Sequence, residues 1–169
     1  MNRIILFICA ALFLCSCSNN ESPKIALSQN WADHYIQLPD SDSLERGKTY
    51  LSIYSQIYST TEERLHNLTS TVSIRNTNLN DTVYIAEASY YNTKGNHIRS
   101  YFEKPIYVAP METIEIVVEF DDIKGGSGGN FVFEWIKAKE SNTPFFEGVM
   151  ISLYGQVGLS FSTQGIEIK

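Results

Sequence analysis

The sequence comes closest to known chemistry in a glycine-rich stretch, residues 121–136, which is DDIKGGSGGNFVFEWI. Its centre, residues 125–129, matches the Gly-x-Ser-x-Gly nucleophile elbow, in which a strained strand-to-helix turn exposes a serine above a sheet. Here Phe131, Phe133 and Trp135 follow at every second position, as in a strand rather than a helix. The pattern therefore lacks the helix that should follow its serine.

The histidines also argue against catalysis at this stretch. Hydrolases with the elbow place the acid and then the histidine after the serine, but His97 is the last histidine and precedes Ser127. His34, His66 and His97 lie far apart and lack the spacing of zinc ligands. Phosphate-loop and dinucleotide patterns are absent as well. We predict no catalytic residue, no metal and no cofactor, and hence a protein that is not an enzyme.

The same glycines resemble one copy of a calcium-binding repeat, Gly-Gly-x-Gly-x-Asp, with Asn130 in place of the aspartate. Such repeats bind calcium by stacking several copies, and the sequence contains one. Asp121 and Asp122 would offer hard oxygens beside the loop. Our favoured interpretation is a glycine corner that joins two strands, and Asp121, Asp122 and Asn130 are the candidate ligands if the loop binds a cation or a small molecule.

Three tyrosines suggest a second kind of site. Tyr50, Tyr54 and Tyr58 alternate with apolar residues, so they would share one face of a strand. Tyrosine offers a large contact area at a small cost in conformational entropy. The three side chains are therefore a candidate surface for binding protein or sugar, unless a neighbouring loop covers them.

The elements that would position these residues lie in one domain, residues 44–169, where the apolar period is close to two and polar breaks recur between the runs. The strands predicted are 48–58, 68–76, 82–91, 97–103, 106–109, 113–120, 130–138, 146–154 and 159–168. We expect an all-β fold, an antiparallel immunoglobulin-like β-sandwich, with a small β-barrel as the alternative.

The first residues have the features of a lipoprotein leader. Arg3 precedes an apolar run that ends at Leu14, too short to span a membrane, so residues 1–16 are predicted to be a signal peptide. Leu14-Cys15-Ser16-Cys17 resembles a lipobox, and Cys17 fits it better than Cys15, which would follow the bulky Phe13 and Leu14. An ordinary secreted protein is the alternative.

Acyl chains on Cys17 would anchor the protein, since each buried methylene contributes ~0.8 kcal/mol. The polar residues 17–43 would form a tether, in which Trp31 and Tyr35 are spaced for a helical turn that docks on the domain; irregular packing of these apolar residues is the alternative. Ser18, rather than aspartate, after the lipid cysteine favours the outer membrane of the cell envelope. The net charge of −6 without a basic cluster argues against nucleic-acid partners.

Several motifs together resemble the bacterial family called domain of unknown function 3124. The likeness covers residues 48–169, although Gly129 stands where alanine is expected and Asn92 where aspartate is expected. It implies a compartment and a domain, and it supplies no activity or catalytic residue. The motifs are residues 54–58, 68–77, 90–92, 125–131, 147–150 and 158–161.

These observations lead to one expected role and one alternative. We expect a membrane-anchored extracytoplasmic lipoprotein whose domain is structural or binds another envelope protein. The alternative is a small-ligand or Ca²⁺-binding module that uses the glycine loop.

Overall fold

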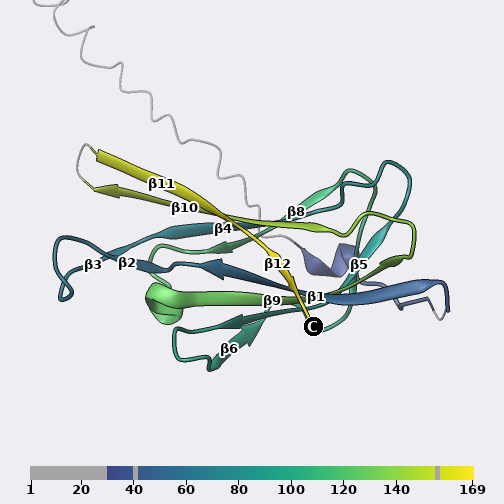
Figure 1. Ribbon diagram of the computed structural model, residues 1–169, viewed down its shortest axis with the longest axis horizontal. Coiled ribbons are helices and arrows are strands. Elements are labelled where there is room, and N and C mark those ends of the chain that lie inside the picture. Colours follow the sequence, from purple (N-terminus) through teal and green to yellow (C-terminus); the bar gives the residue numbers. More distant parts are fainter. Residues whose placement is uncertain (1–29, 40–41, 155–156) are drawn as a thin grey trace, which may run out of the picture.

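Two packed antiparallel sheets form the protein in the computed structural model, which describes residues 30–39, 42–154 and 157–169 (Figure 1). The larger sheet contains, in spatial order, β12 (Ile166–Ile168), β1 (Leu44–Ile53), β9 (Gly129–Ala138), β5 (Val83–Tyr91) and β6 (His97–Ser100), and β7 (Ile106–Val108) also pairs with β5. The smaller sheet contains β11 (Val157–Gln164), β10 (Phe145–Tyr154), β4 (Thr69–Arg75) and β8 (Thr113–Val118). A separate ribbon contains β2 (Gln56–Tyr58) and β3 (Leu65–Asn67).

The open edges of both sheets confirm the β-sandwich and not the barrel alternative, since β12 and β11 each have a strand on one side only within the described residues. The finer expectation of an immunoglobulin-like arrangement stays a prediction. Successive side chains of a strand point to opposite faces of its sheet, so each sheet has one face in the core. In β8, Ile114, Ile116 and Val118 are buried, and the residues between them are exposed.

Stacked aromatic rings join the two sheets through the core. Tyr90 stacks on Phe131 with ring centroids 4.9 Å apart, and Phe133 of the larger sheet stacks on Phe146 of the smaller one at 4.4 Å. Trp135 is also buried, and its indole N–H donates a hydrogen bond to the hydroxyl of Thr49 at 3.0 Å. A buried tryptophan thus has a partner for its one polar group.

Two of the predicted strands are divided, and β3 was not predicted. The segment 48–58 splits into β1 and β2 at Ser55, whose N–H donates to the carbonyl of Gly126 (3.1 Å) instead of continuing a ladder. The segment 159–168 splits at Gly165, where the chain leaves the smaller sheet and joins the larger one. Long-range contacts, which periodicity does not encode, fix both breaks.

The residues before β1 dock on the domain, as the spacing of Trp31 and Tyr35 predicted. The turn is the 3-10 helix η1 (Trp31–His34), and the ring of Trp31 packs on Phe102 with centroids 5.5 Å apart. Tyr35 then pairs with Ile106 of β7. The predicted leader, Cys17 and the first part of the tether lie outside the described residues. In the part that the structure does describe, no helix has the length and hydropathy needed to cross a bilayer.

Candidate functional site

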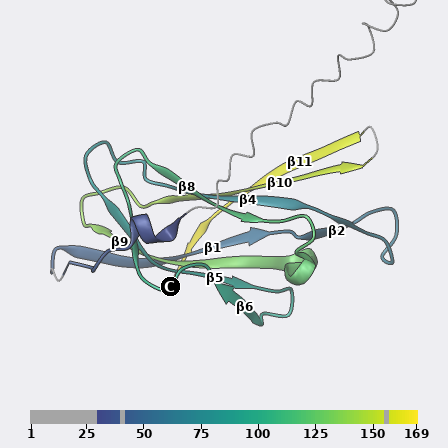
Figure 2. The same cartoon turned by 180° about the vertical axis from the view of Figure 1, so that it is seen from behind.

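The glycine-rich loop forms a corner between β8 and β9, and most of it is the 3-10 segment η2 (Ile123–Gly128), the green turn in Figures 1 and 2. Asp122 begins the segment and accepts a hydrogen bond from the N–H of Lys124 at 3.3 Å. Gly126 has φ 69° and ψ −152°, a conformation that is accessible essentially to glycine alone. The corner depends on this one backbone conformation.

Gly125 is needed for a different reason, which is close packing. A Cβ at this position would lie 1.9 Å from the Tyr90 hydroxyl and 2.7 Å from the Ser55 hydroxyl. These two hydroxyls are buried and hydrogen-bond to each other at 2.7 Å. The backbone of the loop therefore lies directly against a buried polar pair of the sandwich core.

Thr93 fastens the loop to the turn between β5 and β6. Its hydroxyl donates to the carbonyl of Gly125 at 2.9 Å and accepts from the N–H of Gly128 at 3.0 Å, while its own N–H also donates to the Gly125 carbonyl. These three hydrogen bonds satisfy backbone groups that the strands leave unpaired. The loop is thus held as a structural corner, as the favoured interpretation expects.

An ion pair with Arg99 occupies the carboxylate of Asp122, one of the three candidate cation ligands. The Arg99 guanidinium donates to Asp122 at 2.6 Å and to the Tyr101 hydroxyl at 2.6 Å. It lies 5.2 Å from the ring centre of Tyr90 and 4.9 Å from that of Tyr101. A calcium ion at Asp122 would meet this positive charge, which opposes binding.

The two tyrosines beside Arg99 have perturbed acidities. Burial raises the pKa of Tyr90 above its ordinary value of 10.0, although the hydrogen bond with Ser55 opposes the shift. Burial likewise raises the pKa of Tyr101, against the effect of Arg99. Both phenols are neutral near pH 7, so they act here as packed hydrogen-bonding groups.

The other two candidate ligands do not share this cluster. Asp121 is exposed, and Asn130 lies within β9, between Ser52 of β1 and Tyr91 of β5. Across the described ranges, no three His, Cys, Asp or Glu side chains gather closely enough to hold a metal ion.

Each histidine of the hydrolase hypothesis has an oxygen partner other than Ser127. Ser127 is half-buried in η2. The ring nitrogens of His34, His66 and His97 lie 2.9 Å, 2.8 Å and 3.3 Å from oxygens of Glu112, Ser59 and Ser100, respectively.

The three candidate tyrosines belong to three successive pieces of chain. Tyr50 lies on the outer face of β1, Tyr54 follows β1 and packs edge-on against Phe161 (5.6 Å), and Tyr58 is 58% exposed on β2. The break at Ser55 divides the predicted stripe, so only Tyr58 is a largely free side chain.

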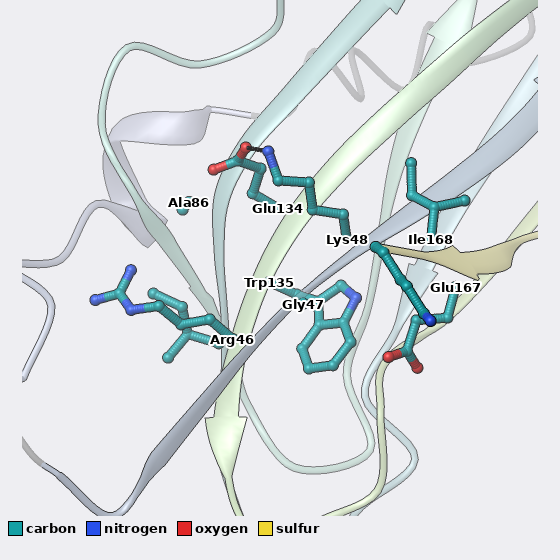
Figure 3. Close-up of a pocket in the computed structure, with 10 residues that line it drawn as sticks. Arg46, Gly47, Lys48, Ala86, Glu134, Trp135, Glu167 and Ile168 are labelled. Carbon is teal, nitrogen blue, oxygen red and sulfur yellow. Dashed lines mark ion pairs between the residues drawn. The ribbon is translucent and has the colours of Figure 1, made fainter.

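A groove of about 400 Å³ lies beside β1, β9 and β12 (Figure 3). Lys48 and Glu134 form an ion pair on its rim, and hydrogen bonding to Glu134 raises the pKa of Lys48. Arg46, Glu167 and Lys169 also line the groove, so it carries charges of both signs. Its lining residues are Arg46, Gly47, Lys48, Ala86, Glu134, Trp135, Ile136, Glu167, Ile168 and Lys169.

Much of the outer face of the smaller sheet has a different character, because it is uncharged and partly apolar. Leu153 is 81% exposed, Val117 49% and Ile151 48%. Hydroxyl side chains of neighbouring strands surround them, since Val117, Thr71, Val149 and Ser162 form one row across the sheet. We call this surface the neutral face and define it by Thr69, Thr71, Val117, Val149, Ile151, Leu153, Ser160 and Ser162.

A charged row marks one end of the neutral face. Arg75 and Glu147 are 3.4 Å apart there, and Glu115 accepts a hydrogen bond from Ser73. The sequence interpretation missed the neutral face, although β10 gives a signal: Val149, Ile151 and Leu153 are apolar on one side, while Phe146 and Met150 are apolar on the other. A strand that is apolar on both faces predicts a contact beyond its own core.

Comparison with known proteins gives a family without an assigned activity. The family model described as "Protein of unknown function (DUF3124)" matches residues 46–168, which confirms the resemblance drawn from the motifs. No curated protein matches the chain. A structure from Thermotoga maritima, titled "Crystal Structure of Thermotoga maritima 1070", is 10% identical with a TM-score of 0.45 over 71% of this chain and 92% of that one. So distant a likeness carries no argument.

Proposed function

Because the chain belongs to the DUF3124 family of proteins of unknown function, its role must be inferred from its own residues, and we propose that it is a membrane-anchored extracytoplasmic lipoprotein with a non-catalytic protein-interaction domain. The observation that carries the interaction role is the neutral face. A monomeric protein seldom leaves a contiguous apolar patch in water unless that patch binds something.

The chemistry of the neutral face indicates the kind of partner. Its exposed apolar side chains, Ile151, Leu153 and Val117, gain free energy when they leave water, at about 25 cal/mol per Å² of apolar area. Its hydroxyl groups can hydrogen-bond without the large desolvation cost of charges. The partner that fits is an envelope protein with an uncharged, partly apolar surface.

The anchoring part of the proposal rests on the leader. An apolar run followed by Leu14-Cys15-Ser16-Cys17 is typical of lipoproteins, and lipid on Cys17 would place the domain at a membrane surface. Labelling cells with a radioactive fatty acid tests this part. The mature chain should take up the label, and Cys17→Ala should abolish it. A label that survives this substitution would contradict anchoring at Cys17.

Site-specific photo-crosslinking tests the interaction role. A photoreactive amino acid at Ile151 samples the neutral face, and the matched control is Leu79, which is 76% exposed in the turn at the far end of β4. In intact cells, position 151 should form a crosslinked species with a defined envelope protein and position 79 should not. Equal crosslinking from both positions, or none from position 151, would refute the assignment of this face.

A further inference from the structure

The free edge of the smaller sheet is β11, which in the described chain has a paired strand, β10, on one side only. Figures 1 and 2 both show it as the outermost strand of a hairpin that projects from the body. The N–H and C=O groups that an edge strand directs outward are a template for another strand. This edge therefore offers backbone hydrogen bonding in addition to the neutral face beside it.

The usual protections of an edge strand are missing from β11. Natural sheets guard their edges with charges, proline or bulges. β11 is VGLSFSTQ, without charge or proline, and its register with β10 continues without a shift from Tyr154 to Glu147. The other edge of the same sheet, β8, carries Glu115 and is followed by Glu119. The contrast marks β11 as the edge suited to pairing.

We propose that β11 pairs with β11 of a second copy of this chain, antiparallel and about a two-fold axis at Ser160. Two smaller sheets would then join into one sheet of eight strands, as in an isologous dimer. The proposal rests on the proposed function in one respect, because a lipid anchor confines the copies to one surface and so raises their effective concentration.

The side chains of β11 fit this register. With Ser160 opposite Ser160, each Leu159 faces the second copy's Phe161, and each Gly158 faces the second copy's Ser162. Residues directly opposite have Cβ atoms about 4.5–5.5 Å apart, so two apolar–aromatic pairs form on one side of the seam. Leu159 is 42% exposed in the single chain, and the second copy's Phe161 would cover it. Within each chain, Phe161 already packs against Tyr54.

Charge favours a second copy as the occupant. The chain has a net charge of −6, so most of its surfaces would repel a copy of themselves. The segment 149–164, which contains β11 and much of β10, has no Asp, Glu, Lys or Arg. The first acidic residue on the β10 side, Glu147, is paired with Arg75. Pairing at Ser160 therefore brings no charged side chain of β11 against its copy.

Disulfide crosslinking of the full mature lipoprotein in its native membrane tests the register. Ser160→Cys would place two thiols on residues whose Cα atoms are about 4.5–5.5 Å apart, within disulfide range. The control is Ser162→Cys, because Ser162 is exposed on the same face. In the dimer, the two residues at position 162 would be offset by four residues, which is ~13 Å along the strands. Under mild oxidation, Ser160→Cys should form a dimer, and Ser162→Cys and the unmodified chain should not.

A charge substitution gives an independent measurement. Ser160→Lys places two like charges at the axis and should convert the detergent-solubilised dimer, measured by light scattering, to a monomer. Val117→Lys, on the other edge of the sheet, should leave the dimer intact. A monomeric wild-type chain, or equal crosslinking from Ser160→Cys and Ser162→Cys, would overturn the proposal.

The outcomes separate this proposal from the proposed function. Crosslinks from Ile151 to another protein without a Ser160→Cys dimer would refute the pairing and leave the interaction role. A Ser160→Cys dimer without fatty-acid labelling would refute the anchor and leave the pairing.

Discussion

Replacing Gly125 with alanine perturbs the contact on which the glycine corner depends. The added Cβ would lie 1.9 Å from the Tyr90 hydroxyl and 2.7 Å from the Ser55 hydroxyl, and real Cβ atoms essentially never approach within 3.0 Å. Tyr90 and Ser55 are both fully buried, so neither side chain can move into solvent. The substitution must therefore displace the loop or break the hydrogen bond between the two hydroxyls.

The expected loss of stability follows from these two effects. Overpacking a well-packed interior costs about 1–3 kcal/mol, and losing a hydrogen bond between buried groups adds about 1 kcal/mol. The free energy of unfolding should fall by ~2–4 kcal/mol, which corresponds to a decrease in Tm of about 5–15 °C for a domain of this size.

Urea unfolding of the mature chain in detergent measures this change. The matched control is Gly128→Ala, whose Cβ would lie 3.2 Å from the methyl group of Thr93, 3.5 Å from its hydroxyl and 3.7 Å from its Cα, all beyond 3.0 Å, and which should cost less than about 1 kcal/mol. Tyr90→Phe removes the oxygen nearest to the added Cβ, although Ser55 Oγ at 2.7 Å and Tyr90 Cζ at 2.8 Å remain close. Gly125→Ala should therefore cost about 1 kcal/mol less in that background. A Gly125→Ala protein as stable as the wild type, or a double-mutant cycle without coupling, would refute this account of the loop.

Four further outcomes are expected. The free energy of unfolding should fall above pH 10, because burial raises the pKa of Tyr90 above 10.0 and the fold holds the neutral phenol. This contribution to stability is fully present below pH 10. In unfolding curves measured between about pH 9 and 11, Tyr90→Phe should reduce the alkaline loss of stability. Thr93→Ala removes two side-chain hydrogen bonds to the loop and should cost ~1–3 kcal/mol in urea unfolding, whereas Thr93→Ser should keep most of the stability. Ser127→Ala should change stability by less than about 0.5 kcal/mol. Calcium should leave Tm unchanged in thermal melting, because Arg99 pairs with Asp122; a Tm that rises with calcium concentration would restore the ion-binding alternative.

Much of the fold is predictable from the sequence because two-residue periodicity reports directly which side of a strand is buried. Alternation identified β8 and β9 and supported the sandwich over a helical fold. The breaks at Ser55 and Gly165 were not predictable, since each depends on contacts with a distant segment. Gly165 shows the reason: a Cβ there would lie 2.6 Å from a methyl group of Thr49, more than a hundred residues away in sequence.

The candidate site was predictable only in part. Glycine composition indicated a corner, but not that Gly126 supplies the unusual backbone conformation while Gly125 supplies close packing. The pairing of Asp122 with Arg99 joins a residue of the glycine-rich loop to a residue of β6 and leaves no local pattern. The neutral face did leave a local pattern, because β10 is apolar on both of its faces. Its exposure, however, depends on the absence of a covering element over β10 in the described structure, and local sequence does not specify that absence.

The most direct test of the interaction role is whether the neutral face is covered in the native envelope. Ile151→Cys and Leu79→Cys place a thiol on the neutral face and on an exposed control turn. A thiol reagent should modify position 151 more slowly in native membranes than in the purified chain, and position 79 at the same rate in both. Equal rates at position 151 in membranes and in purified protein would contradict the claim that this face binds a partner.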